Sequence, residues 1–240
     1  MFSLFEDKLI LGKSSIENDN YDVLVFAVRN IEIVTIPSSA EIISPYAFYG
    51  CDQLKKVEFL NDSKLHTIGI SAFEVSSIET INLPAHLTQI HESAFLNCTK
   101  LKNVEIQANS ELKNIDKAAF ANCAIESFSV PINLIKIGES AFYYCQKLNT
   151  VEIPRDSKLQ IIDVSAFKNS AIKEITIPHH VTHINDSAFL ECRKLQHVEI
   201  PSNSELQLIG SLAFGYTNID KISIPSAVTK IGNNAFAFCR

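Results

Sequence analysis

Apolar and polar residues alternate in a series of short segments spread along the whole chain. They read LKKVEF, IETINLP, LKNVEIQ, IESFSVP, LNTVEIP, IKEITIP, LQHVEIP and IDKISIP, and IEIVTIP (Ile31–Pro37) comes before them. A period of two in segments rich in Val and Ile is typical of a strand with one buried face and one face in water. Seven of the segments end at proline, which cannot donate to a strand ladder. The pattern therefore predicts nine short strands.

Between these segments an Ala-Phe pair recurs, always with an isoleucine five residues before the phenylalanine. The phenylalanines are Phe48, Phe73, Phe95, Phe120, Phe142, Phe167, Phe189, Phe214 and Phe236, at spacings that alternate between 25 and 22. Two slightly different units thus form a 47-residue double repeat. One such unit cannot bury its apolar side alone, so the units must stack into a solenoid with a continuous parallel sheet. The nine phenylalanines are the predicted core ladder.

The repeat divides the chain into two regions. Residues 31–240 form an array of about nine units, the last of them incomplete, and residues 1–30 lie outside it. Residues 1–30, with YDVLVFAV (Tyr21–Val28), are expected to be an N-terminal capping segment that covers the edge of the first strand. The array stops at AFAFCR, partway through a unit, which suggests a fragment of a longer protein. Because Ile231, Phe236 and Cys239 lack a following strand to cover them, we predict end-to-end self-association or fraying there.

Composition and charge narrow the range of partners. The chain is 46% hydrophobic and carries 21 basic and 27 acidic residues, for a net charge of −6. A nucleic-acid or anionic membrane surface needs a concentrated basic patch, and none is visible. No apolar run approaches a membrane span, and the start, MFSLFEDKLILGK, is too acidic for a secretory signal. We expect neither nucleic acid nor membrane contact within this fragment.

One stretch, INDSAFLECRKLQHVEIP, places Asp186, Ser187, Cys192, His197 and Glu199 close together, as a hydrolase site would. Each of these residues, however, occupies a position that recurs along the array. All six cysteines, Cys51, Cys98, Cys123, Cys145, Cys192 and Cys239, follow an Ala-Phe phenylalanine by three residues, and the other units carry Ser76, Ser170 and Thr217 there. A nucleophile or zinc ligand would occur once, with partners at ligand spacing. We predict no enzyme and no cofactor.

The cysteine positions are compatible with either disulfides or free thiols. Cys98, Cys123 and Cys145 fall in adjacent turns, at a separation that a disulfide allows. Parallel side chains in a ladder suit that bond poorly, so free thiols are favoured.

Three histidines, His179, His180 and His183, form the remaining cluster of possible metal ligands. His180 and His183 could hold a metal if they converged. Because no third ligand lies nearby in the sequence, the cluster is interpreted as solvated histidines, and no metal site is assigned.

The polar positions of the strands define the candidate partner-binding face. Glutamates recur in every second strand, at Glu58, Glu105, Glu152 and Glu199, and a neighbouring column includes Lys102 and Lys173. The glutamate row could bind a basic segment of a partner, or it could simply space like charges in solvent; the mixed column could equally stabilise the sheet through cross-strand pairs. Tyr143 and Tyr144, in the turn after Phe142, are further candidate contacts or half-buried packing residues.

The units IPHHVTHINDSAFLECRKLQHVEIP and LPAHLTQIHESAFLNCTKLKNVEIQ closely resemble the leucine-rich repeat of BspA-like, or treponemal-type, surface proteins. The resemblance covers about residues 31–240. It implies a right-handed α/β-type leucine-rich-repeat superhelix with one short parallel strand per repeat of 22 to 25 residues. It also implies a non-enzymatic adhesin or antigen of a bacterium or protozoan, surface-exposed or secreted, which binds host or microbial proteins or glycoproteins such as matrix or plasma proteins. The alternative is an intracellular, cytoplasmic leucine-rich-repeat scaffold for protein–protein interaction.

Overall fold

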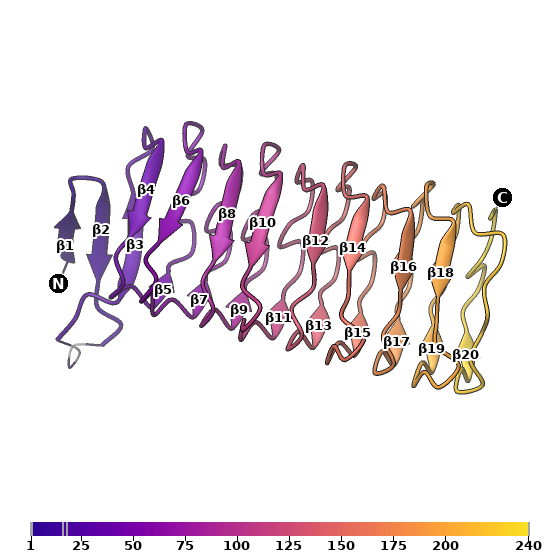
Figure 1. Ribbon diagram of the computed structural model, residues 1–240. Coiled ribbons are helices and arrows are strands. Elements are labelled where there is room, and N and C mark those ends of the chain that lie inside the picture. Colours follow the sequence, from indigo (N-terminus) through magenta and orange to yellow (C-terminus); the bar gives the residue numbers. More distant parts are fainter. Residues whose placement is uncertain (1, 16, 18, 240) are drawn as a thin grey trace.

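The computed structural model describes residues 2–15, 17 and 19–239 as one stack of coils running from the N-terminal to the C-terminal end (Figure 1). Each coil contributes a strand of two residues, and each coil except the last also contributes a longer strand before it, on the other side of a corner. The longer strands are β4 (Ile33–Ile36), β6 (Lys56–Phe59), β8 (Thr80–Leu83), β10 (Asn103–Ile106), β12 (Ser127–Ser129), β14 (Thr150–Glu152), β16 (Glu174–Thr176) and β18 (His197–Glu199). The short strands are β5 (Ile42–Ile43), β7 (Thr67–Ile68), β9 (Gln89–Ile90), β11 (Asn114–Ile115), β13 (Lys136–Ile137), β15 (Ile161–Ile162), β17 (His183–Ile184), β19 (Leu208–Ile209) and β20 (Lys230–Ile231).

The solenoid and its continuous parallel sheet are confirmed, but the sheet is built from a different segment than the alternating pattern suggested. The short strands, each ending at the isoleucine of the repeat, join β1 (Phe2–Phe5), β2 (Leu9–Gly12) and β3 (Val23–Ala27) in a 12-stranded sheet. Every coil except the last therefore has two strands where one was expected, and no helix occurs among the described residues, so the α/β detail is absent. The short strands stay in register because the isoleucine-to-phenylalanine spacing is constant and both side chains stack on their counterparts in the next coil.

The longer strands follow the predicted segments but pair discontinuously, in sheets of four, two and two strands. Complete pairs join strands whose equivalent residues are 23 positions apart, such as Thr176 and Glu199. Between neighbouring strands whose equivalent residues are 24 positions apart, backbone hydrogen bonds form only where the strands begin. Lys173 N, for example, donates to Asn149 O at 3.3 Å. The predicted strand at 219–225 is absent for the same reason: it follows a 24-residue step, and residues 226–239 supply no partner on its other side.

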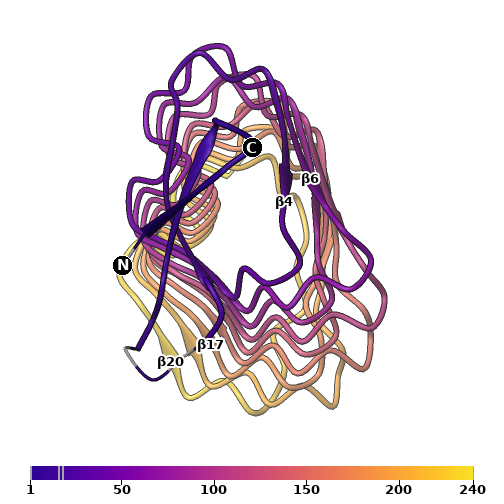
Figure 2. The ribbon, with the colours of Figure 1, turned by 90° about the vertical axis from the view of Figure 1, so that its left-hand side faces the viewer.

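The phenylalanine ladder forms the axis of the core. Adjacent rings stack with centroids 4.7 to 5.5 Å apart. Eight of the nine rings are fully buried, and Phe236 in the last coil is half-buried. Viewed along the stack, each coil has three sides: the longer strand, the short strand, and the Ala-Phe turns, which close the outline (Figure 2).

Residues 2–27 supply three strands before the first regular coil. β1 (Phe2–Phe5) pairs antiparallel with β2 (Leu9–Gly12), which pairs antiparallel with β3 (Val23–Ala27). β3 then lies parallel to β5 and extends the short-strand sheet. Buried Leu9, Leu11 and Leu24 belong to the same core cluster as the ladder.

Candidate binding face

The face of the longer strands carries the glutamate row in a regular hydrogen-bonded arrangement. In each complete pair a small polar residue stands opposite a glutamate, as Thr35 does for Glu58 and Asn82 for Glu105. Ser129 donates to Glu152 Oε2 at 3.2 Å, and Thr176 donates to Glu199 Oε2 at 3.3 Å. These hydroxyls orient the carboxylates while leaving them exposed.

Glu58 differs from the other three glutamates because it has a cationic partner. Lys56 Nζ lies 2.7 Å from Glu58 Oε1, and this hydrogen bond is the main reason that the pKa of Glu58 lies below its usual value. Within residues 2–15, 17 and 19–239, no ion pair involves Glu105, Glu152 or Glu199. The structure thus presents three uncompensated carboxylates in this row.

The neighbouring column of mixed charge forms few pairs. Lys55 Nζ meets Glu32 Oε2 at 2.9 Å, whereas Lys102 and Lys173 are exposed and take part in no ion pair among the described residues. Cross-strand stabilisation by these two lysines is therefore not supported by the geometry, and their ammonium groups are accessible to a partner.

Shallow grooves lie on this face where the longer strands diverge. One, of about 360 Å³, is lined by parts of β14 and β16 together with His197 and Glu199. A second, of about 400 Å³, lies between β18 and residues 220–223 and shares the same two side chains. A third lies between β6 and β8 beside Glu58. All three follow 24-residue steps, so the double repeat places a carboxylate beside each groove.

The tyrosines lie on a different side of the coil from the glutamate row. Tyr143 and Tyr144 follow Phe142 in the Ala-Phe turns and are 37% and 42% exposed. Lys168 Nζ sits 5.9 Å from the Tyr143 ring centroid, and the two tyrosine rings are 5.9 Å apart. A partner that contacts both the tyrosines and the glutamates must therefore reach around an edge of the solenoid.

The hydrolase-like cluster is dispersed by the fold. Asp186 accepts from Ser211 N in the next coil, and Ser187 occupies a turn with φ of 58°. Cys192 points into the core, while His197 and Glu199 lie on the longer-strand face. The five side chains share no common pocket.

The cysteines form an internal hydrogen-bonded column. The thiols of Cys98, Cys145 and Cys192 donate to the carbonyl of the preceding coil's phenylalanine at 3.0, 3.1 and 3.0 Å. Where serine fills the position, it meets the next cysteine, as Ser170 meets Cys192 at 3.2 Å. Burial raises the pKa of Cys145 and of Cys192 to about 12. All six cysteines are free thiols in the structure, and Cys145 and Cys192, which burial keeps protonated, are poor nucleophiles.

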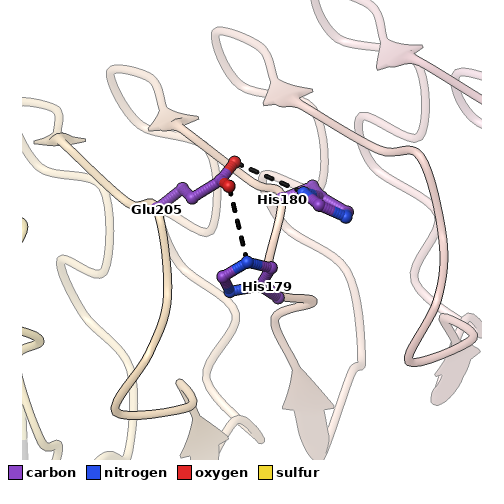
Figure 3. A group of neighbouring side chains, drawn as sticks. All are labelled: His179, His180 and Glu205. Carbon is purple, nitrogen blue, oxygen red and sulfur yellow. Dashed lines mark hydrogen bonds and ion pairs between the residues drawn. The ribbon is translucent and has the colours of Figure 1, made fainter.

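In the structure, the neighbour of His179 and His180 is Glu205 and not His183, which the sequence had suggested. His183 Nδ1 lies 2.8 Å from Thr182 Oγ1 and does not converge with His180. Instead, Glu205 from the following coil approaches both His179 and His180, with Nε2–Oε1 3.4 Å and Nδ1–Oε2 3.3 Å (Figure 3). Glu205 was missed because it lies 25 residues from His180, which is one coil further along the array. That repeat spacing was the signal that could have identified it.

The sequence profile of the BspA type leucine-rich repeat region matches residues 22–131 and 113–240, with six copies. The chain belongs to the BspA-type leucine-rich-repeat family. Solenoids of leucine-rich repeats typically serve as non-enzymatic binding scaffolds with extended recognition surfaces. Within the described residues no helix is long and apolar enough to cross a membrane. A search of curated proteins found no match.

Solved structures of bacterial leucine-rich-repeat proteins are similar to this BspA-type array. The Treponema pallidum protein TpLRR is 21% identical, with a TM-score of 0.59, over 90% of this chain and 85% of its own. The pneumococcal vaccine antigen PcpA is 23% identical, with a TM-score of 0.57, over 92% of this chain, which spans 62% of the antigen. A Bacteroides ovatus leucine-rich repeat protein is 18% identical, with a TM-score of 0.52, over 98% and 92% of the two chains. At these sequence identities, the structural similarity establishes the fold alone.

Proposed function

We propose that this array is a non-enzymatic recognition module, displayed at a cell surface or secreted, whose longer-strand face binds host or microbial proteins or glycoproteins. Matrix and plasma proteins with basic extended segments are the partner class that fits the charge of this face. The observation that carries the proposal is the row of exposed, uncompensated carboxylates, of which Glu152 and Glu199 line the grooves.

The spacing of the row suits an extended partner. Glu105, Glu152 and Glu199 recur every second coil, at about 10 Å given the usual strand separation. A Lys or Arg of a bound segment could donate to a carboxylate while neighbouring residues occupy the adjacent groove. At Glu152 and Glu199, fixed hydroxyl contacts reduce the entropy lost on binding, because these two carboxylates are already oriented.

Surface location is supported by relatives of similar fold. PcpA is described as a vaccine antigen, and a protein must be accessible to antibodies to act as one. We therefore propose the same exposure for the protein that contains this array.

The test combines localisation with binding. Intact source cells are labelled with an antibody to this chain, and the purified chain is titrated onto immobilised matrix and plasma proteins. Glu105→Lys together with Glu152→Lys should weaken saturable binding more than about tenfold. Glu74→Lys with Glu92→Lys makes the same charge change outside the glutamate row, on the Ala-Phe side, at two glutamates that form no ion pair among the described residues, and should leave binding within about twofold. Equal losses from both pairs would refute the assignment of the face.

A cytoplasmic scaffold is the second candidate, and the free thiols favour it. Unpaired cysteines are usual in a reducing compartment. An internal antibody signal, with no binding to matrix or plasma proteins, would establish this alternative over the adhesin.

A further inference from the structure

We propose that His179, His180 and Glu205 form a surface site for a first-row divalent transition metal such as Zn²⁺. Their ligand atoms all lie within 4.8 Å of one another. Two imidazoles and one carboxylate are a donor set that zinc accepts, with water in the fourth position.

The two distances between imidazole and carboxylate suit a tetrahedral ion, with each imidazole facing a different Glu205 oxygen, and the two imidazole nitrogens lie within 4.8 Å of each other. Zinc lies about 2.0–2.2 Å from nitrogen and oxygen ligands, which puts neighbouring ligand atoms about 3.3–3.5 Å apart. Glu205 lies 3.4 Å from His179 Nε2 and 3.3 Å from His180 Nδ1. In Figure 3 both rings turn a nitrogen toward the carboxylate, so small rotations of the Glu205 side chain would admit the ion.

The backbone holds the three residues in place. Glu205 N donates to His179 O at 2.9 Å, so the two coils are joined at this point. Val181 N donates to Pro178 O at 3.2 Å, and Ser204 N donates to Pro201 O at 3.0 Å, which closes a tight turn in each coil. The ligands therefore start from fixed turns rather than from free loops, which lowers the ordering cost of binding.

The chain contains an incomplete copy of the same arrangement. His86 Nδ1 lies 3.0 Å from Glu111 Oε1, and Glu111 N donates to Ala85 O at 2.8 Å. Here Ala85 replaces His179, so the pair has two donors instead of three. A lone His–Glu pair is thus a recurrent contact between coils, and the second histidine is what creates the metal site.

The test is a calorimetric titration of the intact chain with Zn²⁺, and the internal copy supplies matched variants for it. All proteins carry Cys239→Ser, which removes the half-buried thiol as a competing ligand. The parent should bind about one ion per chain. His179→Ala should weaken binding more than about tenfold, and it places at 179 the residue that position 85 already carries, so the fold should persist. His86→Ala should leave binding unchanged, and Ala85→His should add a second site.

A second readout separates ligation from a purely structural role. Zinc should raise the thermal midpoint of the parent and of His86→Ala, but not that of His179→Ala. Mg²⁺ should have no effect, because imidazole is a poor ligand for it. The absence of saturable zinc binding, or equal binding by the parent and His179→Ala, would overturn the proposal. A lack of any gain in Ala85→His would overturn the inference that the second histidine is what turns a His–Glu pair into a metal site.

Discussion

Truncation of a central ring of the phenylalanine ladder should destabilise the protein far more than truncation of the last ring. Phe142 is fully buried and stacks between Phe120 at 5.4 Å and Phe167 at 5.3 Å. A third ring, Phe128, lies 4.7 Å away. Phe→Ala in a core costs about 3–5 kcal/mol, of which each aromatic pair accounts for about 0.5–1.5 kcal/mol.

The site around Phe142 cannot collapse easily, because Phe142 N donates to Ala166 O at 2.8 Å and fixes the backbone between coils. We therefore expect the upper part of the range, about 4–5 kcal/mol. Phe236 is half-buried and stacks on Phe214 alone, at 5.5 Å, so Phe236→Ala should cost about 1 kcal/mol. Urea unfolding followed by circular dichroism measures both. If Phe142→Ala and Phe236→Ala lowered the free energy of unfolding by amounts equal within about 0.5 kcal/mol, the ladder would not be the main source of stability.

Further predictions concern the cysteine column and the last coil. Burial raises the pKa of Cys145 and of Cys192 from the ordinary value of 9.0 to about 12, so at alkaline pH the native state retains protons that the unfolded state releases. The contribution of these thiols to stability is therefore complete below pH 9 and declines toward pH 12. The double variant Cys145→Ser with Cys192→Ser should show a shallower alkaline loss in urea titrations, and a parallel loss would contradict this. Cys145→Ser alone should cost less than about 1 kcal/mol. Cys145→Val removes the thiol that donates to Phe120 O and leaves that carbonyl only the bond from Cys123 N at 3.3 Å, so it should cost more, about 1–1.5 kcal/mol. Ile231 is 50% exposed on the last coil, so light scattering should detect concentration-dependent association that Ile231→Glu reduces; a monomer at all concentrations would exclude it.

The candidate site was only partly predictable. The glutamate row follows from the repeat, since the alternating pattern alone places Glu105 and Glu152 on the outward face. The grooves do not, because they arise where strands diverge at 24-residue steps, and this depends on how each connection folds. The separation of Tyr143 from the glutamates is likewise a property of the three-sided coil, which a linear pattern does not show.

The sequence by itself determined the array. Its constant Ile-to-Phe spacing, its buried Ala-Phe pairs and its small polar position after each phenylalanine are local rules that hold in every unit, whatever the neighbouring connections do. The tertiary structure alone decided which strands form the continuous sheet and which residues of successive coils meet. Two-residue strands carry almost no sequence signal, yet they pair because the stacked core fixes their positions along the solenoid axis. In contacts such as His179–Glu205, the residues are about one coil length apart. That spacing is present in the sequence, but only the folded stack brings the two side chains together.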